Sequence, residues 1–201
     1  PVQRSSSDSD GVLGVDEVTQ ADGALMKSDS AIVRMVRLIA LEILKDYAGK
    51  DPVLVGVMNG SFMFMADLVR ALSYPKRLAH EPMYPEVDFI KVNSYDHTHS
   101  TGTVNMVSGL SCDIKNRHVI VVEDIVDTGL TLQYVKDYLF SQNPTSVSVT
   151  ALLVKTGAGL DYQHQHHVAY PGFHVGKDFV FGYGLDISGR WRSLNELRIL
   201  L

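Results

Sequence analysis

The sequence predicts a single α/β domain built around a mostly parallel β-sheet. Short apolar runs of strand length alternate along the chain with segments of helical periodicity, which is the pattern of βαβ units. The chain has 201 residues, of which 45% are hydrophobic, so one domain can bury its own core. Parallel strands joined by helical crossovers account for both observations.

The predicted elements follow in order from the amino terminus. Residues 1–11 are rich in serine and aspartate and are expected to form a mobile tail, which leaves residues 12–201 as the domain. Apolar side chains recur at helical spacing over residues 30–47, and Gly49 and Pro52 follow as stop signals. The run PVLVGVM then predicts a buried strand, NGS a turn and FMFMADLVRAL a helix. Later elements are strands at 87–92, 118–122 and 146–154 and a helix at 131–140.

Composition narrows the classes of partner. The net charge is -5 and the isoelectric point is near 5.9, which argues against a surface for nucleic acid or for an anionic membrane. Small molecules are therefore the expected partners. The one cysteine, Cys112, fits a reducing compartment. Because no apolar run approaches about 18 residues and the first residues lack a signal-peptide pattern, we expect a cytoplasmic protein.

The stretch VVEDIVDTGLTL carries the densest chemistry. An apolar strand runs into Glu123 and Asp124 and then into a glycine-containing turn that opens a helix. Backbone N–H groups at such a turn, aided by the helix dipole and threonine hydroxyls, form an anion site. The two acids can accept hydrogen bonds from vicinal hydroxyls or face a metal, so the segment suits a ribose 5-phosphate. The alternative is that aspartate and threonine merely cap the helix. The expected phosphate cradle comprises Asp127, Thr128, Gly129, Leu130 and Thr131.

This stretch resembles the phosphoribosyl diphosphate (PRPP) motif of type I phosphoribosyltransferases, and its residues are similar to those of the hypoxanthine-guanine members. Three further regions match in family order, so the resemblance covers roughly residues 25 to 200. It implies a central, mostly parallel sheet flanked by helices, with a small hood built from amino- and carboxy-terminal segments. It also implies magnesium as cofactor and a homodimer or homotetramer.

The first further region is GVMNGS, which resembles the family's pyrophosphate loop. The resemblance assigns Met58, Asn59 and Gly60 to pyrophosphate binding through backbone N–H groups, with a cis peptide between Met58 and Asn59. Many relatives carry lysine at the position of Asn59, so a cation is missing here. The alternative is an ordinary NGS turn.

The second region, VNSYDHTHSTG, resembles the family's mobile loop. Ser94 and Tyr95 would close over the site and exclude water from a cation-like sugar. An ordinary exposed loop is the alternative.

The third region runs from LLVKTG to DFVFGYGLDISGRWRSL. The resemblance assigns Lys155 to the purine O6, Phe179 to stacking on the base and Val180 to the ring edge through its backbone. Asp186 matches a carboxylate near the base, magnesium and pyrophosphate, and Arg192 matches a pyrophosphate contact. Individually, Lys155 could be a surface lysine, Phe179 a core aromatic and Arg192 a solvated charge.

The resemblance implies a purine-salvage reaction. Asp127 would exchange a proton with purine N7 as hypoxanthine or guanine displaces pyrophosphate from PRPP, giving IMP or GMP. Magnesium would lie near Glu123, Asp124 and Asp186. Alternatives are a variant that accepts xanthine or guanine alone and, more remotely, a PRPP-sensing regulator on the same fold.

The sequence contains two smaller motifs. QHQHH, residues 163–167, is expected to form a solvated loop rather than a metal site. Gly182 and Gly184 in GYGLD are expected to mark close backbone approaches, because the pattern lacks the third glycine of a dinucleotide fingerprint.

Overall fold

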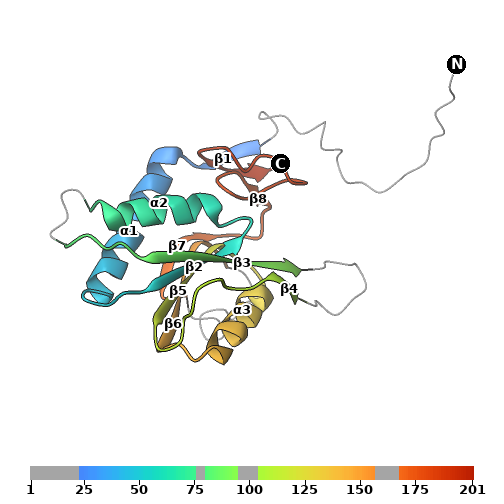
Figure 1. Cartoon of the computed structure of the whole chain (residues 1–201). Coiled ribbons are helices and arrows are strands. Elements are labelled where there is room, and N and C mark those ends of the chain that lie inside the picture. The colour runs from blue at the N-terminus through green and yellow to red at the C-terminus, as the bar shows by residue number, and fades with distance from the viewer. Residues whose placement is uncertain (1–22, 76–79, 95–103, 157–167) are drawn as a thin grey trace, which may run out of the picture.

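A computed structural model of the chain describes residues 23–75, 80–94, 104–156 and 168–201 (Figure 1). The expected tail at 1–11, Tyr95 and the QHQHH stretch lie outside the described residues. No helix in the described part is long and apolar enough to cross a membrane.

A central sheet runs through the described part of the molecule. Six strands are ordered β4-β3-β2-β5-β6-β7, and every neighbouring pair is parallel except β3 with β4. The predicted mostly parallel sheet is therefore confirmed, with an antiparallel strand at one edge. The strands are β2 (Val53–Met58), β3 (Glu86–Ser94), β4 (Val104–Ser108), β5 (His118–Val126), β6 (Ser146–Lys155) and β7 (Tyr170–Val175).

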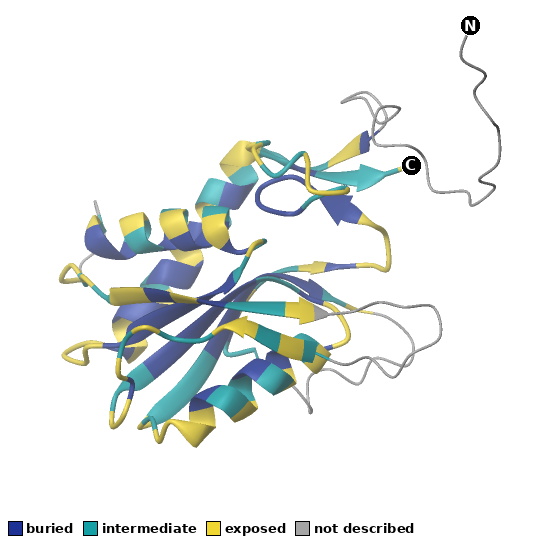
Figure 2. Cartoon of the chain, turned by 45° about the vertical axis from the view of Figure 1, so that its right-hand side comes forward, coloured by how far each residue is buried: buried dark blue, intermediate teal, exposed yellow. Residues whose placement is uncertain are grey.

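Helices cover both faces of this sheet. Helices α1 (Asp29–Asp46) and α2 (Phe62–Ser73) lie on one face, and α3 (Leu130–Ser141) lies on the other (Figure 1). Alternate side chains of a strand point to opposite faces, so Ile120 and Val122 of β5 pack with α1 and α2, whereas Val119 and Val121 pack with α3. Figure 2 shows the resulting buried strands between partly exposed helices.

The predicted helices begin and end within two residues of the observed ones. Ser28 accepts a hydrogen bond from the Ala31 N–H and so caps α1, while Gly49 follows the helix with a φ of 71°. A positive φ favours glycine, which is why Gly49 could be recognised in the sequence as a signal for the end of the helix.

A second, smaller sheet forms the expected hood. Among the described residues, β1 (Gly23–Lys27), β9 (Leu197–Leu200) and β8 (Val180–Phe181) pair antiparallel in that order. Ala24 pairs with Ile199, so the amino- and carboxy-terminal segments meet beside the central sheet (Figure 1). The hood thereby lies next to α2 and the loop that precedes it.

Asp88 fastens the loop after β4 to β3. Its carboxylate accepts hydrogen bonds from the N–H groups of Phe89, Ser111 and Cys112 at 2.7 to 2.9 Å. Burial opposes the ionisation of Asp88, but these N–H groups outweigh it and lower its pKa to about 2. Burial and, after it, the same carboxylate raise the pKa of the Cys112 thiol to about 11, which keeps it a thiol at neutral pH.

Candidate active site

Three segments meet at the carboxyl ends of neighbouring strands in the central sheet. Strands β2, β5 and β6 are parallel neighbours, so their carboxyl ends lie side by side. The NGS loop follows β2, the phosphate-cradle residues follow β5, and Lys155 ends β6. Residues that are more than 90 positions apart in the sequence, such as Asn59 and Lys155, are thereby gathered at one site.

Glu123 and Asp124 differ in their surroundings. Glu123 is only 6% exposed, and its Oε2 has no hydrogen-bond partner among the described residues. Burial and the neighbouring Asp124 raise the pKa of Glu123 well above its usual value. Asp124 is half-buried, and its Oδ1 accepts a hydrogen bond from the Ile125 N–H at 2.8 Å. A buried carboxyl oxygen without a partner is a place for a ligand hydroxyl or a cation.

The charge state of Asp124 depends on two elements. Burial raises its pKa to about 6, although the Ile125 N–H and Arg192 lower it, and Asp186 adds to the rise. Arg192 and Asp186 belong to the hood, so β5 and the hood act electrostatically on the same carboxylate.

The turn after β5 opens α3 through a glycine in the left-handed conformation. Gly129 is the N-cap residue of α3, with a φ of 74°. This helix start has no capping hydrogen bond from a side chain of the described residues. The alternative in which aspartate or threonine caps this helix is therefore wrong. Asp127, Thr128 and Leu130 are exposed around the turn, and the first N–H groups of a helix have no partner within the helix, so they are available to a ligand.

The NGS loop packs directly on Asp124. The peptide between Met58 and Asn59 is cis, as the resemblance implied. A Cβ added to Gly60 would lie 1.6 Å from Asp124 Oδ2, so a larger residue would require the loop or this carboxylate to move. Ser61, fully buried, donates from its hydroxyl to the Val57 carbonyl at 2.7 Å and so closes the loop onto β2.

The hood contacts this loop through a second glycine. A Cβ on Gly184, whose φ is 103°, would lie 2.0 Å from the Gly60 carbonyl oxygen. Arg192 donates to the Gly184 carbonyl at 2.6 Å and pairs with Asp186 at 2.7 Å. Gly182 likewise lies against a carbonyl, that of Glu196, so the predicted close approaches at both glycines are confirmed.

Lys155 ends β6, and Phe179 directly precedes β8 of the hood. Lys155 Nζ donates to Asp127 Oδ2 at 2.8 Å across neighbouring strand ends. Phe179 is 53% exposed, so its interpretation as a core aromatic is wrong. Val180 is buried and pairs with Ile199 in the hood.

One predicted region is only partly described. Ser94 is the last residue of β3, whose end lies beside that of β2, and nothing is described of its side chain. Tyr95 lies outside the described residues. Their assignment to a closing loop stays a prediction.

Comparisons with known proteins agree with this geometry. A family model described as a phosphoribosyl transferase domain matches residues 26–187. A hypoxanthine-guanine phosphoribosyltransferase of Streptococcus pneumoniae is 36% identical over 178 residues, which is 88% of this chain and 92% of that protein. Another from Dictyostelium discoideum is 35% identical over 172 residues, 85% of this chain and 91% of that one.

Solved structures show the same likeness. A hypoxanthine phosphoribosyltransferase from Staphylococcus aureus has a TM-score of 0.80 at 30% identity, covering 94% of this chain and 97% of that one. The structure and the sequence thus agree on the fold and on the kind of relative. The chain belongs to the phosphoribosyl transferase family, among the hypoxanthine-guanine phosphoribosyltransferases of purine salvage.

Proposed function

We propose that the chain transfers the 5-phosphoribosyl group of PRPP to N9 of hypoxanthine or guanine, giving IMP or GMP and pyrophosphate. The observation that carries the choice of base is the 2.8 Å contact between Lys155 Nζ and Asp127 Oδ2, where the ends of β6 and β5 lie side by side. A 6-oxopurine offers an acceptor at O6 and an N–H at N7. A lysine donor and a carboxylate acceptor held next to each other match that pair of groups.

PRPP fits the remaining groups of the site. Its 5-phosphate would bind the turn at Thr128 and Gly129 at the amino end of α3, together with the Thr131 hydroxyl. Its ribose hydroxyls would donate to Glu123 and Asp124. Its pyrophosphate would bind the loop at Met58, Asn59 and Gly60 and the Arg192 guanidinium.

Oxygen donors suit magnesium in this place. Glu123, Asp124 and Asp186 present only carboxylate oxygens, and the Glu123 Oε2 lacks a partner among the described residues. No group of three or more acids, histidines or cysteines in the described part is placed to hold a metal by itself. Mg²⁺ commonly takes one or two carboxylates and completes its shell with water and substrate phosphate oxygens, so the donor set fits. When bound, it would neutralise charge on the leaving pyrophosphate.

The residues of the chain then divide the reaction between them. As purine N9 forms its bond to C1 of the ribose, the bond from C1 to pyrophosphate breaks, and Asp127 accepts the proton from N7. Phe179 stacks on the base and Lys155 donates to O6. Ser94 and Tyr95 would exclude water while the sugar carries positive charge.

Lys155 would also discriminate between bases. Adenine places an amino group, itself a donor, opposite the lysine, and the mismatch costs on the order of 1–3 kcal/mol or more. Xanthine differs from hypoxanthine at C2, away from Lys155, so activity with xanthine or with guanine alone is the open alternative. A PRPP-sensing regulator is disfavoured because the chain is acidic, with a net charge of -5.

The experiment measures pyrophosphate release by purified protein supplied with magnesium and PRPP. Release that depends on hypoxanthine or guanine is the expected result, and the xanthine rate separates the specificity variants. Tight PRPP binding by calorimetry, with no release in the presence of any base, would instead favour the regulator.

A second copy of the chain is the partner we propose for the exposed apolar side chains of α2 and β3. Phe62, Val87 and Phe89 are all exposed. Val87 and Phe89 point to the same face of β3, and Phe89 lies over Gly56 beside Met65 of α2, the helix that Phe62 begins. Such a face fits a homodimer or homotetramer. Light scattering of the wild type and of Phe89→Asp tests it, because a change of mass to the monomer is expected only for the variant.

A cytoplasmic location belongs to the same proposal and agrees with the thiol of Cys112.

A further inference from the structure

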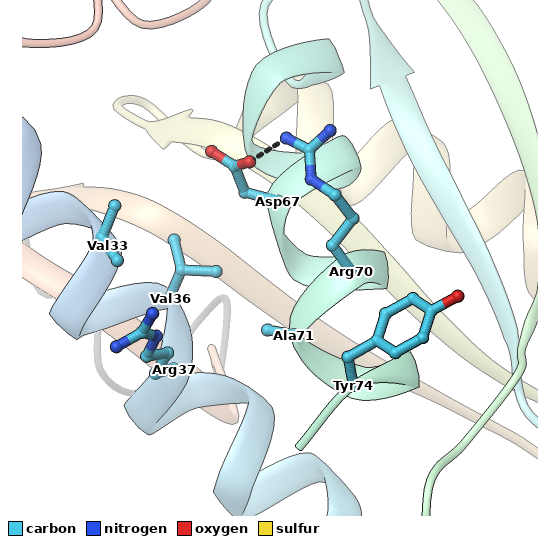
Figure 3. Close-up of a pocket in the computed structure, with 7 residues that line it drawn as sticks. All are labelled: Val33, Val36, Arg37, Asp67, Arg70, Ala71 and Tyr74. Carbon is cyan, nitrogen blue, oxygen red and sulfur yellow. Dashed lines mark hydrogen bonds and ion pairs between the residues drawn. The ribbon is translucent and has the colours of Figure 1, made fainter. Parts of the chain in front are cut away.

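The carboxylate of Asp67, a residue of α2, accepts hydrogen bonds from two side chains. Its Oδ1 accepts from Arg70 one turn along the helix, beside a pocket of about 200 Å³ between α1 and α2 (Figure 3). Its Oδ2 accepts from the Tyr183 hydroxyl at 2.5 Å. Arg70 therefore helps to hold the carboxylate, and Tyr183 joins it from the hood.

Tyr183 lies between the two glycines of the hood turn. Its side chain is 3% exposed, and burial together with Asp67 raises its pKa far above the usual value. The hydroxyl is therefore a permanent donor at physiological pH. The Tyr183 N–H donates to the Leu194 carbonyl and the Gly184 N–H to the Arg192 carbonyl, so movement of this residue is transmitted to Arg192.

Two neighbouring residues of the hood thus contact two neighbouring segments of the chain, the pyrophosphate loop and helix α2. Gly184 lies on the Gly60 carbonyl of the pyrophosphate loop, and Tyr183 bonds to Asp67 in the helix that follows that loop. Arg192, which donates to the Gly184 carbonyl, lies on the hood side of both contacts. The glycine contact sets how close the hood can come, and the tyrosine bond resists its separation and rotation.

We propose that the hydrogen bond from Tyr183 to Asp67 is a positioning link that holds Arg192 and Asp186 against the pyrophosphate loop and so sets affinity for the pyrophosphate group. Neither Tyr183 nor Asp67 is among the residues assigned to the substrates, so both are positioning residues. The inference rests on the proposed function, because it takes the loop and Arg192 as the pyrophosphate site.

Tyr183→Phe tests the link, since it removes one hydroxyl and keeps the ring. A hydrogen bond to a carboxylate is among the stronger kinds, so we expect the Kd for PRPP and the Ki for pyrophosphate to rise about tenfold. The KM for hypoxanthine and the kcat at saturating PRPP should change less than about twofold. A merely structural hydroxyl would not separate these constants.

The chain offers a matched control in Tyr170→Phe. Tyr170 is also buried and donates to an aspartate, Asp46 of α1, at 3.0 Å, but from β7 rather than from the hood. This variant should lose a similar amount of thermal stability with PRPP affinity unchanged. Asp67→Ala should weaken PRPP binding as Tyr183→Phe does, and the double variant should be no weaker than Asp67→Ala alone, because both changes break one bond.

The possible outcomes are distinct. An unchanged Kd for PRPP in folded Tyr183→Phe, while the wild type binds and turns over PRPP, overturns the link alone. Equal weakening in Tyr170→Phe also overturns it, because general loosening would then explain the effect. A wild type that neither binds PRPP nor forms nucleotide overturns the proposed function and the link together.

Discussion

Gly60 makes the sharpest test of the site, because its Cα lies against a carboxylate that the proposed reaction uses. In Gly60→Ala the new Cβ would lie 1.6 Å from Asp124 Oδ2 and 2.4 Å from Asp124 Cγ. Since Cβ contacts below 3.0 Å are essentially never seen, the loop or the carboxylate must move by roughly 1.4 Å. Asp124 cannot simply rotate away without straining or losing its 2.8 Å bond to the Ile125 N–H. Misplacement of about 1 Å at a reacting centre can cost about 100-fold.

We therefore expect Gly60→Ala to lower kcat/KM for PRPP by at least about 100-fold, equivalent to about 2.7 kcal/mol of transition-state stabilisation. The assay is initial-rate nucleotide formation at varied PRPP and saturating hypoxanthine. Gly49→Ala is the matched control: it has open space around its Cβ but a φ of 71°, so it should lose about 1 kcal/mol of stability and keep its rate. A Gly60→Ala protein with wild-type kcat/KM would refute this geometry of loop and carboxylate.

Three further predictions concern single carboxylates and the lysine of the site. Because the pKa of Asp124 is raised from 3.8 to about 6, protonation should weaken PRPP binding as the pH falls through 6. The stability of the free protein should fall as the pH rises from 3.8 to about 6, and the full loss should be present above that pH. Asp124→Asn should therefore raise the Tm at pH 7 and flatten the pH dependence of calorimetric binding. Because the pKa of Asp88 is lowered, its contribution to the free energy of unfolding is present at neutral pH and is lost as the pH falls from about 4 to 2. Asp88→Asn should therefore lower the free energy of unfolding at pH 7 by about 2 kcal/mol, and urea titrations at pH 3 should show a smaller difference. Lys155→Met should raise the KM for hypoxanthine at least about tenfold and leave the Kd for PRPP unchanged, and equal effects on both would contradict its assignment to the base.

Long periodic segments were predictable from the sequence, whereas short strands were not. The runs that became β2, β5 and β6 are nearly continuous apolar sequences, and their helices show clear 3.6-residue periodicity. Strands β8 and β9 have two and four residues, too few for any period to be recognised. Their pairing also depends on partners far away, as between Ala24 and Ile199, so local sequence carries little of the signal.

Part of the candidate site could likewise be predicted from the sequence, and part could not. The acids and the turn after β5 are contiguous, so their chemistry was legible in one stretch of sequence. The packing of Gly60 on Asp124 and the bond from Tyr183 to Asp67, 116 residues apart, arise only when the elements assemble. A buried tyrosine near the hood has no sequence signature that distinguishes it from an ordinary core aromatic.

The proposed transfer to 6-oxopurines is tested most directly by comparing two bases under identical conditions. Purified protein with magnesium and PRPP is given hypoxanthine or adenine, and nucleotide formation is followed by ultraviolet absorbance and chromatography. The proposal predicts IMP from hypoxanthine and a rate with adenine at least about 100-fold lower, because Lys155 meets a donor rather than an acceptor. AMP formation at a comparable rate, or no nucleotide from hypoxanthine and none from guanine with folded protein, would contradict it.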